Sequence, residues 1–302
     1  MVQAVNSALD NMLSKDEDVL VFGEDVGYFG GVFRTTDGLQ EKHGAHRVFD
    51  TPLSEGGIAA IAFGMGLNGL KPVCEIQFAD YIFPAYDQIV NEIAKLRHRS
   101  GGEFWTPITI RTPAGGGIRG GHHHSQSPES QFTHTPGLKV VYSSTPYNAK
   151  GLLISAIESE DPVIVFEPKR CYRGPFYGDP HKVPTWSGHS EAEVPDVHYT
   201  VPIGEARLVN EGNDCTVIAW GTMVHVCEEG IRQSGASCDL IDLQSLIPWD
   251  RGAVVRSVKK TGRCVIVHEA PKTSGYGAEM AASVQERCFW SLEAPVTRVT
   301  GW

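Results

Sequence analysis

The chain of 302 residues alternates short apolar runs with helical patterns along most of its length. In the first half the runs include DVLVFGEDV (18–26), TPITIRTP (106–113) and DPVIVFEP (161–168). Continuous apolar runs of this kind are typical of strands buried on both faces. The segments between them, such as 2–14 and 84–100, repeat their apolar residues at helical spacing. Strands that alternate with helices predict a parallel sheet covered by helices on both sides.

The pattern stops from about residue 171 to 200, where Pro, Gly, Tyr and His are frequent and no periodicity remains. This composition is typical of a linker. A second alternating series follows it, from DCTVIAWGT (214–222) to APVTRVTG (294–301). We therefore expect an α/β protein with two doubly wound domains and mostly parallel sheets.

The charge balance limits the classes of partner. A net charge of −10, from 26 basic and 36 acidic side chains, argues against nucleic acid or an anionic membrane as the main partner. No apolar stretch approaches the ~18 residues of a membrane-spanning helix, and the N-terminus lacks a signal-peptide layout. The seven cysteines are scattered without a CxxC pair, which indicates reduced thiols. We expect a soluble protein of the bacterial cytoplasm, or of the mitochondrial matrix if the source is eukaryotic.

Three loop segments follow strand-like runs in the first half: GEDVGYFGGVFR (23–34), TPLSEGG (51–57) and PAGGGIRGGHHHSQSPES (113–130). Ligands of open parallel sheets collect at the carboxyl ends of the strands, so all three segments could face one site. The glycine-rich segment with three consecutive histidines has three interpretations: a surface loop, a metal site, or a loop that handles protons. A metal site would need a further Cys, Asp or Glu at fixed spacing.

Glu55 lies immediately before a Gly- and Ala-rich helical pattern. In one interpretation Ser54 caps this helix and Glu55 is an acid in its first turn, where the helix dipole favours negative charge. In the other, Glu55 is a carboxylate held at the helix entrance so that it faces a cofactor. The residues alone leave both interpretations open.

Eight sequence blocks occur in order across nearly the whole chain: GEDVGYFGGVFR, RVFDTPLSEGGIA, PVCEIQFADYIFPAYDQIVNE, HSQSPE, PGLKVV, DPVIVFEPKR, IDLQSLIPWD and KTGRCVIVHEA. Together they resemble the β chains of the decarboxylating E1 component of branched-chain 2-oxo acid dehydrogenases, members of the transketolase-like thiamin-diphosphate family. The resemblance implies a pyrimidine-binding domain over 1–180, a linker over 181–200 and a transketolase C-terminal-like domain over 201–302. Relatives continue beyond this point, so we expect the second domain to be truncated at its C-terminus.

The resemblance also implies roles for single residues around thiamin diphosphate. Glu55 matches the glutamate that hydrogen-bonds N1′ of the aminopyrimidine, which helps its amino group to remove the thiazolium C2 proton. Leu53, Gln77 and Tyr81 match residues that line the pyrimidine pocket, with Tyr81 as an aromatic face against the ring. For these three, a core leucine and buried polar partners remain the alternative.

Further positions match the family less directly. His124 matches the histidine thought to orient the reaction intermediate and to supply a proton during acyl transfer, whereas His122 and His123 depart from the common pattern. Glu24 matches an acid placed between the two cofactors of the tetramer, a candidate for a proton tunnel. Some members bind a monovalent cation such as K⁺ through backbone oxygens, at positions that correspond to Ile108, Ala156, Ser159 and Asp161.

The chain lacks the GDG motif, followed by Asn, that holds Mg²⁺ and the cofactor diphosphate in this superfamily. We therefore expect these ligands on an E1 α subunit, an α2β2 heterotetramer, and no activity of the β chain alone. The acyl group would pass to the lipoyl group of an E2 acyltransferase. The expected substrates are branched-chain 2-oxo acids of the 3-methyl-2-oxobutanoate type. The alternatives are a pyruvate-specific β chain, an acetoin-type enzyme and a non-catalytic β-like scaffold.

Overall fold

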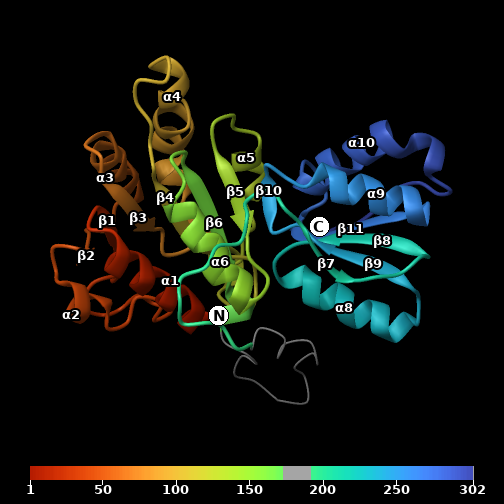
Figure 1. Ribbon diagram of the computed structural model, residues 1–302, viewed down its shortest axis with the longest axis horizontal. Helices are drawn as coiled ribbons and strands as arrows, with labels where there is room; N and C mark the ends of the chain where they lie inside the picture. The colour runs from red at the N-terminus through yellow and green to blue at the C-terminus, as the bar shows by residue number, and fades with distance from the viewer. Residues whose placement is uncertain (173–191, 302) are drawn as a thin grey trace.

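The computed structural model describes residues 1–172 and 192–301, which form two α/β domains side by side (Figure 1). The predicted boundary at residue 180 and much of the predicted linker over 181–200 lie outside the described residues. The first domain contains a sheet of seven strands and the second a sheet of five.

The first sheet has the strand order β10-β5-β6-β4-β3-β1-β2. Its strands are β1 (Val19–Gly23), β2 (Val48–Asp50), β3 (Lys71–Glu75), β4 (Thr109–Ala114), β5 (Lys139–Tyr142), β6 (Val163–Pro168) and β10 (Ser245–Ile247). All neighbours are parallel except β10, which runs antiparallel to β5. Every residue of β1, β4 and β6 is buried, as the continuous apolar runs predict.

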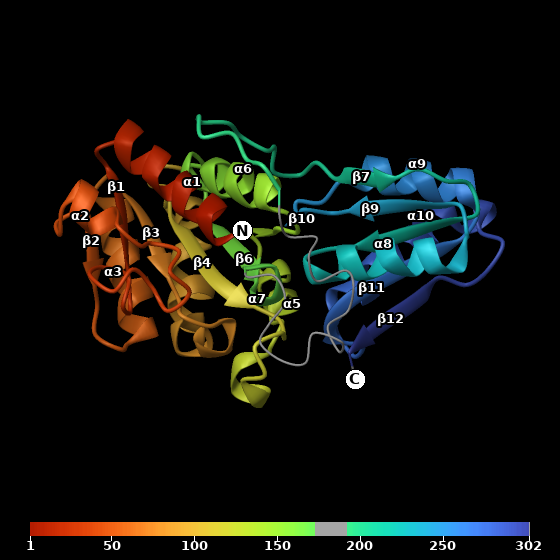
Figure 2. The ribbon, with the colours of Figure 1, turned by 90° about the horizontal axis from the view of Figure 1, so that it is seen from below.

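Helices cover both faces of this sheet. They are α1 (Val2–Lys15), α2 (Leu39–His43), α3 (Glu55–Leu67), α4 (Leu96–Arg99), α5 (Glu129–Thr133), α6 (Pro146–Ile157) and α7 (Lys169–Tyr172). Figure 2 shows α1 and α6 side by side over one face. Val19 and Val21 of β1 pack with these two helices, whereas Leu20 and Phe22 point into the core beneath α3. The alternation of side chains along one strand thus builds two cores.

The prediction of one long helix over 84–100 is wrong. The structure has a 3₁₀ turn at Phe83–Ala85, a π-helix at Gln88–Ile93 and only then α4. The backbone N–H of Ala94 donates to the carbonyl of Ile89, five residues earlier, which closes the wider turn. The carbonyl of Ala94 approaches Gly137 so closely that a Cβ there would lie 1.9 Å from the oxygen.

The second sheet has the order β12-β11-β8-β9-β7, in which only β7 is antiparallel to its neighbour. Its strands are β7 (Arg207–Asn210), β8 (Cys215–Ala219), β9 (Cys238–Asp242), β11 (Cys264–Pro271) and β12 (Thr297–Gly301). The helix α8 (Thr222–Ser234) lies on one face, and α9 (Arg251–Thr261) and α10 (Tyr276–Cys288) lie on the other (Figure 1). The predicted fold class, two α/β domains with mostly parallel sheets, is confirmed.

The two domains are joined by more than chain connectivity. Strand β10 follows β9 of the second domain in sequence yet completes the sheet of the first. The side-chain amide of Asn148 donates to Gln244 Oε1 at 3.0 Å, and the hydroxyl of Ser144 donates to Asp242. Polar contacts between buried groups therefore fix the domains against each other near the start of α6.

The cysteines and the helices agree with a globular protein. All seven cysteines are free thiols, and six of them are buried. Within the parts of the chain that the structure describes, no helix is long and apolar enough to cross a membrane.

Candidate functional site

The residues predicted for the site lie at the carboxyl edge of the first sheet. Glu24 follows β1, Glu55 follows β2 at the start of α3, Gln77 and Tyr81 follow β3, and His124 lies in the loop after β4. The carboxyl ends of parallel strands meet at one edge of a sheet. The topology therefore brings together segments that are up to a hundred residues apart in sequence.

Glu55 is the first residue of α3, and its side chain is buried. Ser54 occupies the N-cap position and Glu55 is an acid in the first turn, as the capping interpretation predicts. The Ser54 side chain makes no capping hydrogen bond, so that part of the interpretation is wrong. In residues 1–172 and 192–301, no side chain or backbone group hydrogen-bonds to the carboxylate of Glu55. Unlike Oε1 of Glu24, the carboxylate oxygens of Glu55 are not fully enclosed by the protein. Glu55 can therefore receive a donor from outside this chain.

A second buried acid, Glu24, lies near Glu55. Burial raises the pKa of Glu24, and the negative charges of Glu55, Asp25 and Glu75 raise it further. Its Oε1 atom is buried and has no hydrogen-bond partner among the described residues. The carboxyl group of Glu24 therefore retains its proton to a higher pH than an ordinary glutamic acid.

Arg111, which the sequence analysis did not single out, anchors the sheet beneath these acids. Its guanidinium is fully buried and pairs with Glu167, with N···O distances of 3.0 and 2.7 Å, and with Glu75. A further N–H donates to the Thr35 hydroxyl at 3.1 Å. Burial raises the pKa of Glu75, while the charge of Arg111 acts against this rise. An arginine within the apolar run TPITIRTP was the sequence signal for this cluster.

His124 has partners for both ring nitrogens. Its Nδ1 lies 3.0 Å from the carbonyl oxygen of Gly120, and its Nε2 lies 3.2 Å from the Tyr81 hydroxyl. A carbonyl can only accept, so Nδ1 carries the proton in the neutral ring and Nε2 accepts from Tyr81. The ring of Phe78 meets His124 edge to face at 4.5 Å between centroids. Two predicted site residues, Tyr81 and His124, are thus in direct contact.

The neighbouring histidines are placed differently. His122 and His123 are exposed, and their rings lie 3.9 Å apart. His122 lines a cavity of about 460 Å³ between the histidine-bearing loop and the end of β11 in the second domain. No group of three or more His, Cys, Asp or Glu side chains suited to a metal ion occurs among the described residues.

The remaining pocket candidates, Leu53 and Gln77, are not core residues. Leu53 is 81% exposed, so the alternative of a core leucine is wrong. The amide nitrogen of Gln77 donates to the carboxylate of Asp25 at 3.2 Å and links the loops after β3 and β1. Leu53 lies two residues before Glu55 in the sequence. Gln77 contacts Asp25, which is the residue after Glu24.

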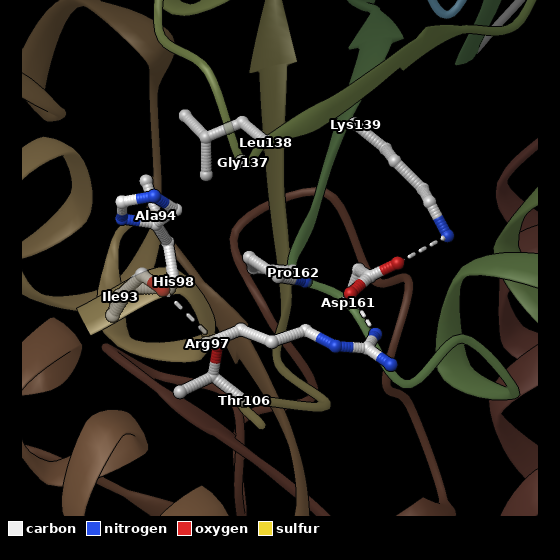
Figure 3. A pocket seen from close by; sticks show the side chains of 10 residues that line it. All are labelled: Ile93, Ala94, Arg97, His98, Thr106, Gly137, Leu138, Lys139, Asp161 and Pro162. Atoms are coloured by element: carbon white, nitrogen blue, oxygen red, sulfur yellow. Dashed lines mark hydrogen bonds and ion pairs between the residues drawn. The ribbon is translucent and has the colours of Figure 1, made fainter. Parts of the chain in front are cut away.

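The four candidate cation-binding positions lie at the opposite, amino-terminal edge of the same sheet. The carbonyls of Ile108, Ala156 and Asp161 each accept a hydrogen bond within the chain, from Val163 N, Ser159 N and Ser159 Oγ. Figure 3 shows the Asp161 carboxylate between the cationic groups of Arg97 and Lys139. These ion pairs border a pocket of about 390 Å³.

Comparisons with known proteins follow the same division of the chain. Residues 1–175 match the family of transketolase pyrimidine-binding domains, and residues 204–302 match the family of transketolase C-terminal domains. A solved structure described as a split-gene transketolase, an inactive β4 tetramer, superposes with a TM-score of 0.73 at 21% identity. The match covers 99% of this chain and 87% of that one, and at this identity it shows the fold alone.

Curated relatives are similar over the whole chain. The 2-oxoisovalerate dehydrogenase subunit beta of Pseudomonas aeruginosa is 57% identical, with 100% of this chain and 87% of the relative covered. The mitochondrial 2-oxoisovalerate dehydrogenase subunit beta of Dictyostelium discoideum is 54% identical, with 100% and 79% covered. A pyruvate dehydrogenase E1 component subunit beta, from Acholeplasma laidlawii, is 46% identical, with 100% and 89% covered.

Proposed function

Because this chain belongs to the transketolase-like family of 2-oxo acid dehydrogenase β subunits, we propose that it is the β half of a branched-chain E1 enzyme. This enzyme would decarboxylate 2-oxo acids of the 3-methyl-2-oxobutanoate type and pass the acyl group to the lipoyl group of an E2 acyltransferase. Identity of 57% to a branched-chain relative against 46% to a pyruvate relative supports this substrate class. The carboxylate of Glu55, which has no hydrogen-bond partner among residues 1–172 and 192–301, is the observation that carries the catalytic part of the proposal.

The residues of the site fit the aminopyrimidine half of thiamin diphosphate. When bound, this cofactor supplies the carbon nucleophile and the electron sink that the decarboxylation requires. Glu55 offers a carboxylate without a partner in the described chain, Tyr81 offers an aromatic face, and Leu53 an exposed apolar side chain. Gln77 adds a polar group on the loop after β3. These four residues would hold the pyrimidine.

Proton movement would use three groups of this chain. Glu55 would hold a proton between its carboxylate and the pyrimidine nitrogen. Glu24, whose pKa is raised by burial and by Glu55, would take up or release a proton nearby. His124 would accept a proton at Nε2 and deliver it to the sulfur that departs during acyl transfer, because an imidazole nitrogen can both accept and donate a proton.

The diphosphate half and Mg²⁺ would be held by an E1 α subunit in an α2β2 heterotetramer. The missing GDG motif supports this assignment. So do large apolar side chains exposed at the same edge of the sheet, among them Tyr28 at 91% and Phe29 at 52%. Aromatic side chains such as these are enriched at protein–protein interfaces.

The proposal extends to a monovalent cation such as K⁺ near Ile108, Ala156, Ser159 and Asp161. A carbonyl oxygen that accepts one hydrogen bond retains a second lone pair. A pocket of about 380 Å³ beside these residues is lined by Glu158, Glu160, Asp161 and Lys139. Each of these carboxylates already pairs with a cationic side chain of this chain, so the support for a cation comes from the carbonyl oxygens. A melting temperature equal in potassium chloride and in choline chloride would exclude this part of the proposal.

The direct test is to purify the chain together with an α partner and to measure CO₂ release. We expect faster release from 3-methyl-2-oxobutanoate than from pyruvate under matched conditions. The reverse preference would assign the chain to pyruvate dehydrogenases. An assembled tetramer that turns over neither substrate would identify a scaffold chain.

A further inference from the structure

Asp80 connects the turn that carries Tyr81 to the loop that carries His124. It lies on the 3₁₀ turn Ala79–Tyr81, and its side chain is buried. Its Oδ1 atom accepts the backbone N–H groups of Ser125 at 3.1 Å and of Gln126 at 3.2 Å. Hydrogen bonds from N–H groups to a carboxylate are about twice as strong as those between neutral groups. Asp80 therefore fixes the backbone immediately after His124.

The loop needs such an anchor because it contributes little to a core. We define residues 115–126 as the histidine loop; none of its residues from 116 to 126 is buried. The loop is closed at its base by a hydrogen bond from Gly115 N to Gln126 O at 2.9 Å. A Cβ at Gly120 would lie 2.5 Å from the Cβ of His124, so the backbone at Gly120 packs closely against the His124 side chain. The position of His124 therefore depends on hydrogen bonds of the loop, including one from Gly116 N to Glu269 at 3.2 Å, and on the edge-to-face contact with Phe78.

The turn Ala79–Tyr81 thus contacts the imidazole of His124 through Tyr81 and the backbone after His124 through Asp80. The Tyr81 hydroxyl contacts Nε2 of His124, and the carboxylate of Asp80 holds the next two peptide groups. If the second contact were lost, the loop could move away while Tyr81 stayed in place. The distance between Tyr81 and His124 depends on Asp80 for this reason.

The charge of Asp80 has a second partner behind the loop. Lys169 is fully buried, and its ammonium lies 5.7 Å from the centroid of the Phe78 ring that contacts His124. Burial lowers the pKa of Lys169 to about 8, and the charges of Asp80 and Glu269 act against this decrease. A neutral residue at position 80 would remove one of these two compensating charges.

We propose that Asp80 is a positioning residue for acyl transfer: its carboxylate holds the histidine loop so that the imidazole of His124 stays against Tyr81. The inference rests on the proposed function of His124, through which Asp80 acts without touching the substrate. Decarboxylation depends on Glu55 and the cofactor, so it is much less sensitive to the position of this loop.

The experiment uses Asp80→Ala, Asp80→Ser and Asp80→Asn in the assembled αβ enzyme. Two rates are measured on each preparation: acylation of a lipoyl domain, and CO₂ release with an artificial electron acceptor. We expect Ala and Ser to lower the ratio of acylation to CO₂ release by roughly 10–100-fold, the scale of a misplaced reacting group. The loss should fall on kcat rather than on KM for the lipoyl domain. Asn retains an oxygen acceptor and should restore most of the ratio.

A readout independent of turnover is hydrogen–deuterium exchange of the amides of Ser125 and Gln126. Their exchange should accelerate in Asp80→Ala and Asp80→Ser and remain close to the parent in Asp80→Asn. Asp250→Ala is the matched control, because the Asp250 carboxylate also accepts two backbone N–H groups, from Ala253 at 2.8 Å and Ala206 at 3.2 Å, but in the second domain. It should lower stability without changing the ratio.

The variant His124→Ala separates the proposed function of His124 from the positioning role of Asp80. If His124→Ala keeps a normal ratio, the proposed function of His124 fails. If it lowers the ratio while Asp80→Ala and Asp80→Ser leave both ratio and exchange unchanged, the positioning inference alone is overturned. Adding Asp80→Ala to His124→Ala should cause no further loss in the ratio, since residues that act as a unit are not additive. A further loss would mean that Asp80 acts independently of His124.

Discussion

The carboxyl group of Glu129 in the first domain accepts a hydrogen bond from the indole nitrogen of Trp220 in the second, at 3.2 Å. Glu129 ends the HSQSPE block, which begins with His124. Trp220 in turn stacks on His268 at 5.1 Å between ring centroids. Glu129 is completely buried, and burial raises its pKa from 4.5 to about 8. A carboxyl group that keeps its proton up to about pH 8 in the folded state therefore lies at the domain interface beside the candidate site.

This pKa predicts that the stability of the protein falls as pH rises. Between pH 4.5 and about 8 the folded state keeps the Glu129 proton while the unfolded state loses it. Stability from this group is fully present below the lower value and is lost through the upper one, at up to about 1.4 kcal/mol per pH unit. Glu129→Gln is neutral and should remove this slope in urea unfolding from pH 5 to 9. Glu286→Gln, at an exposed position, should not. Parallel pH profiles for parent and Glu129→Gln would contradict the assignment.

Arg111→Met should destabilise the first domain strongly. It leaves Glu75 and Glu167 buried next to each other without the cation that pairs with both. Breaking a buried ion pair on one side costs about 3–5 kcal/mol. The measurement is the free energy of unfolding in urea. Arg99→Met is the control, because its pair with Glu92 is exposed and should contribute at most about 1 kcal/mol. Equal losses of unfolding free energy in Arg111→Met and Arg99→Met would show that the buried ion pairs of Arg111 stabilise the protein no more than an exposed pair does.

Glu55→Gln should reduce turnover by roughly 10²–10⁴-fold, the scale of one acid–base group, with assembly preserved. The amide keeps the size and polarity of the side chain but no longer shares a proton. Glu41→Gln is a suitable control, since Glu41 also lies in the first turn of a helix, α2, away from the site. Near-normal activity of Glu55→Gln in the assembled enzyme would show that Glu55 is only an acid in the first turn of α3 and has no role in the reaction.

The isolated chain should neither bind thiamin diphosphate tightly nor decarboxylate. It offers the pyrimidine side of the site but lacks the motif for the diphosphate and Mg²⁺. Titration calorimetry with magnesium present is the measurement. Micromolar affinity of the purified β chain alone for thiamin diphosphate would show that this chain contains a diphosphate site of its own.

The central strands were predictable because each is a continuous apolar run, such as VLVFG in β1. The edge strands β2, β7 and β10 were not, since three or four residues with partial exposure leave too short a pattern. The transfer of β10 to the first sheet depends on contacts between domains, which no local signal encodes. The break in the helix after Phe83 was missed because a π turn preserves an apolar spacing close to that of an α-helix.

Only some residues of the candidate site could be predicted from the sequence, for a similar reason. Glu55 and His124 lie in blocks that the family resemblance singles out, and the topology brings their segments to one edge of the sheet. Asp80 and Arg111 act through contacts with residues 36 to 76 positions away, and sequence spacing says nothing about such contacts. The residue type indicated a special role only for Arg111, because a charged side chain is unusual within an apolar strand.

The last prediction distinguishes the three consecutive histidines. Only His124 has partners on both ring nitrogens, Gly120 O and the Tyr81 hydroxyl, whereas His122 and His123 are exposed and contact each other. A ring held in one tautomer presents the same nitrogen to every substrate, while a mobile ring does so only part of the time. We therefore expect His124→Ala to lose lipoyl acylation far more than CO₂ release to an artificial acceptor. His122→Ala and His123→Ala should change both activities little. Equal loss of the two activities in His124→Ala would make this residue a general substrate-positioning group. A larger effect at His122, which faces the cavity between the domains, would instead assign acyl transfer to that side of the loop.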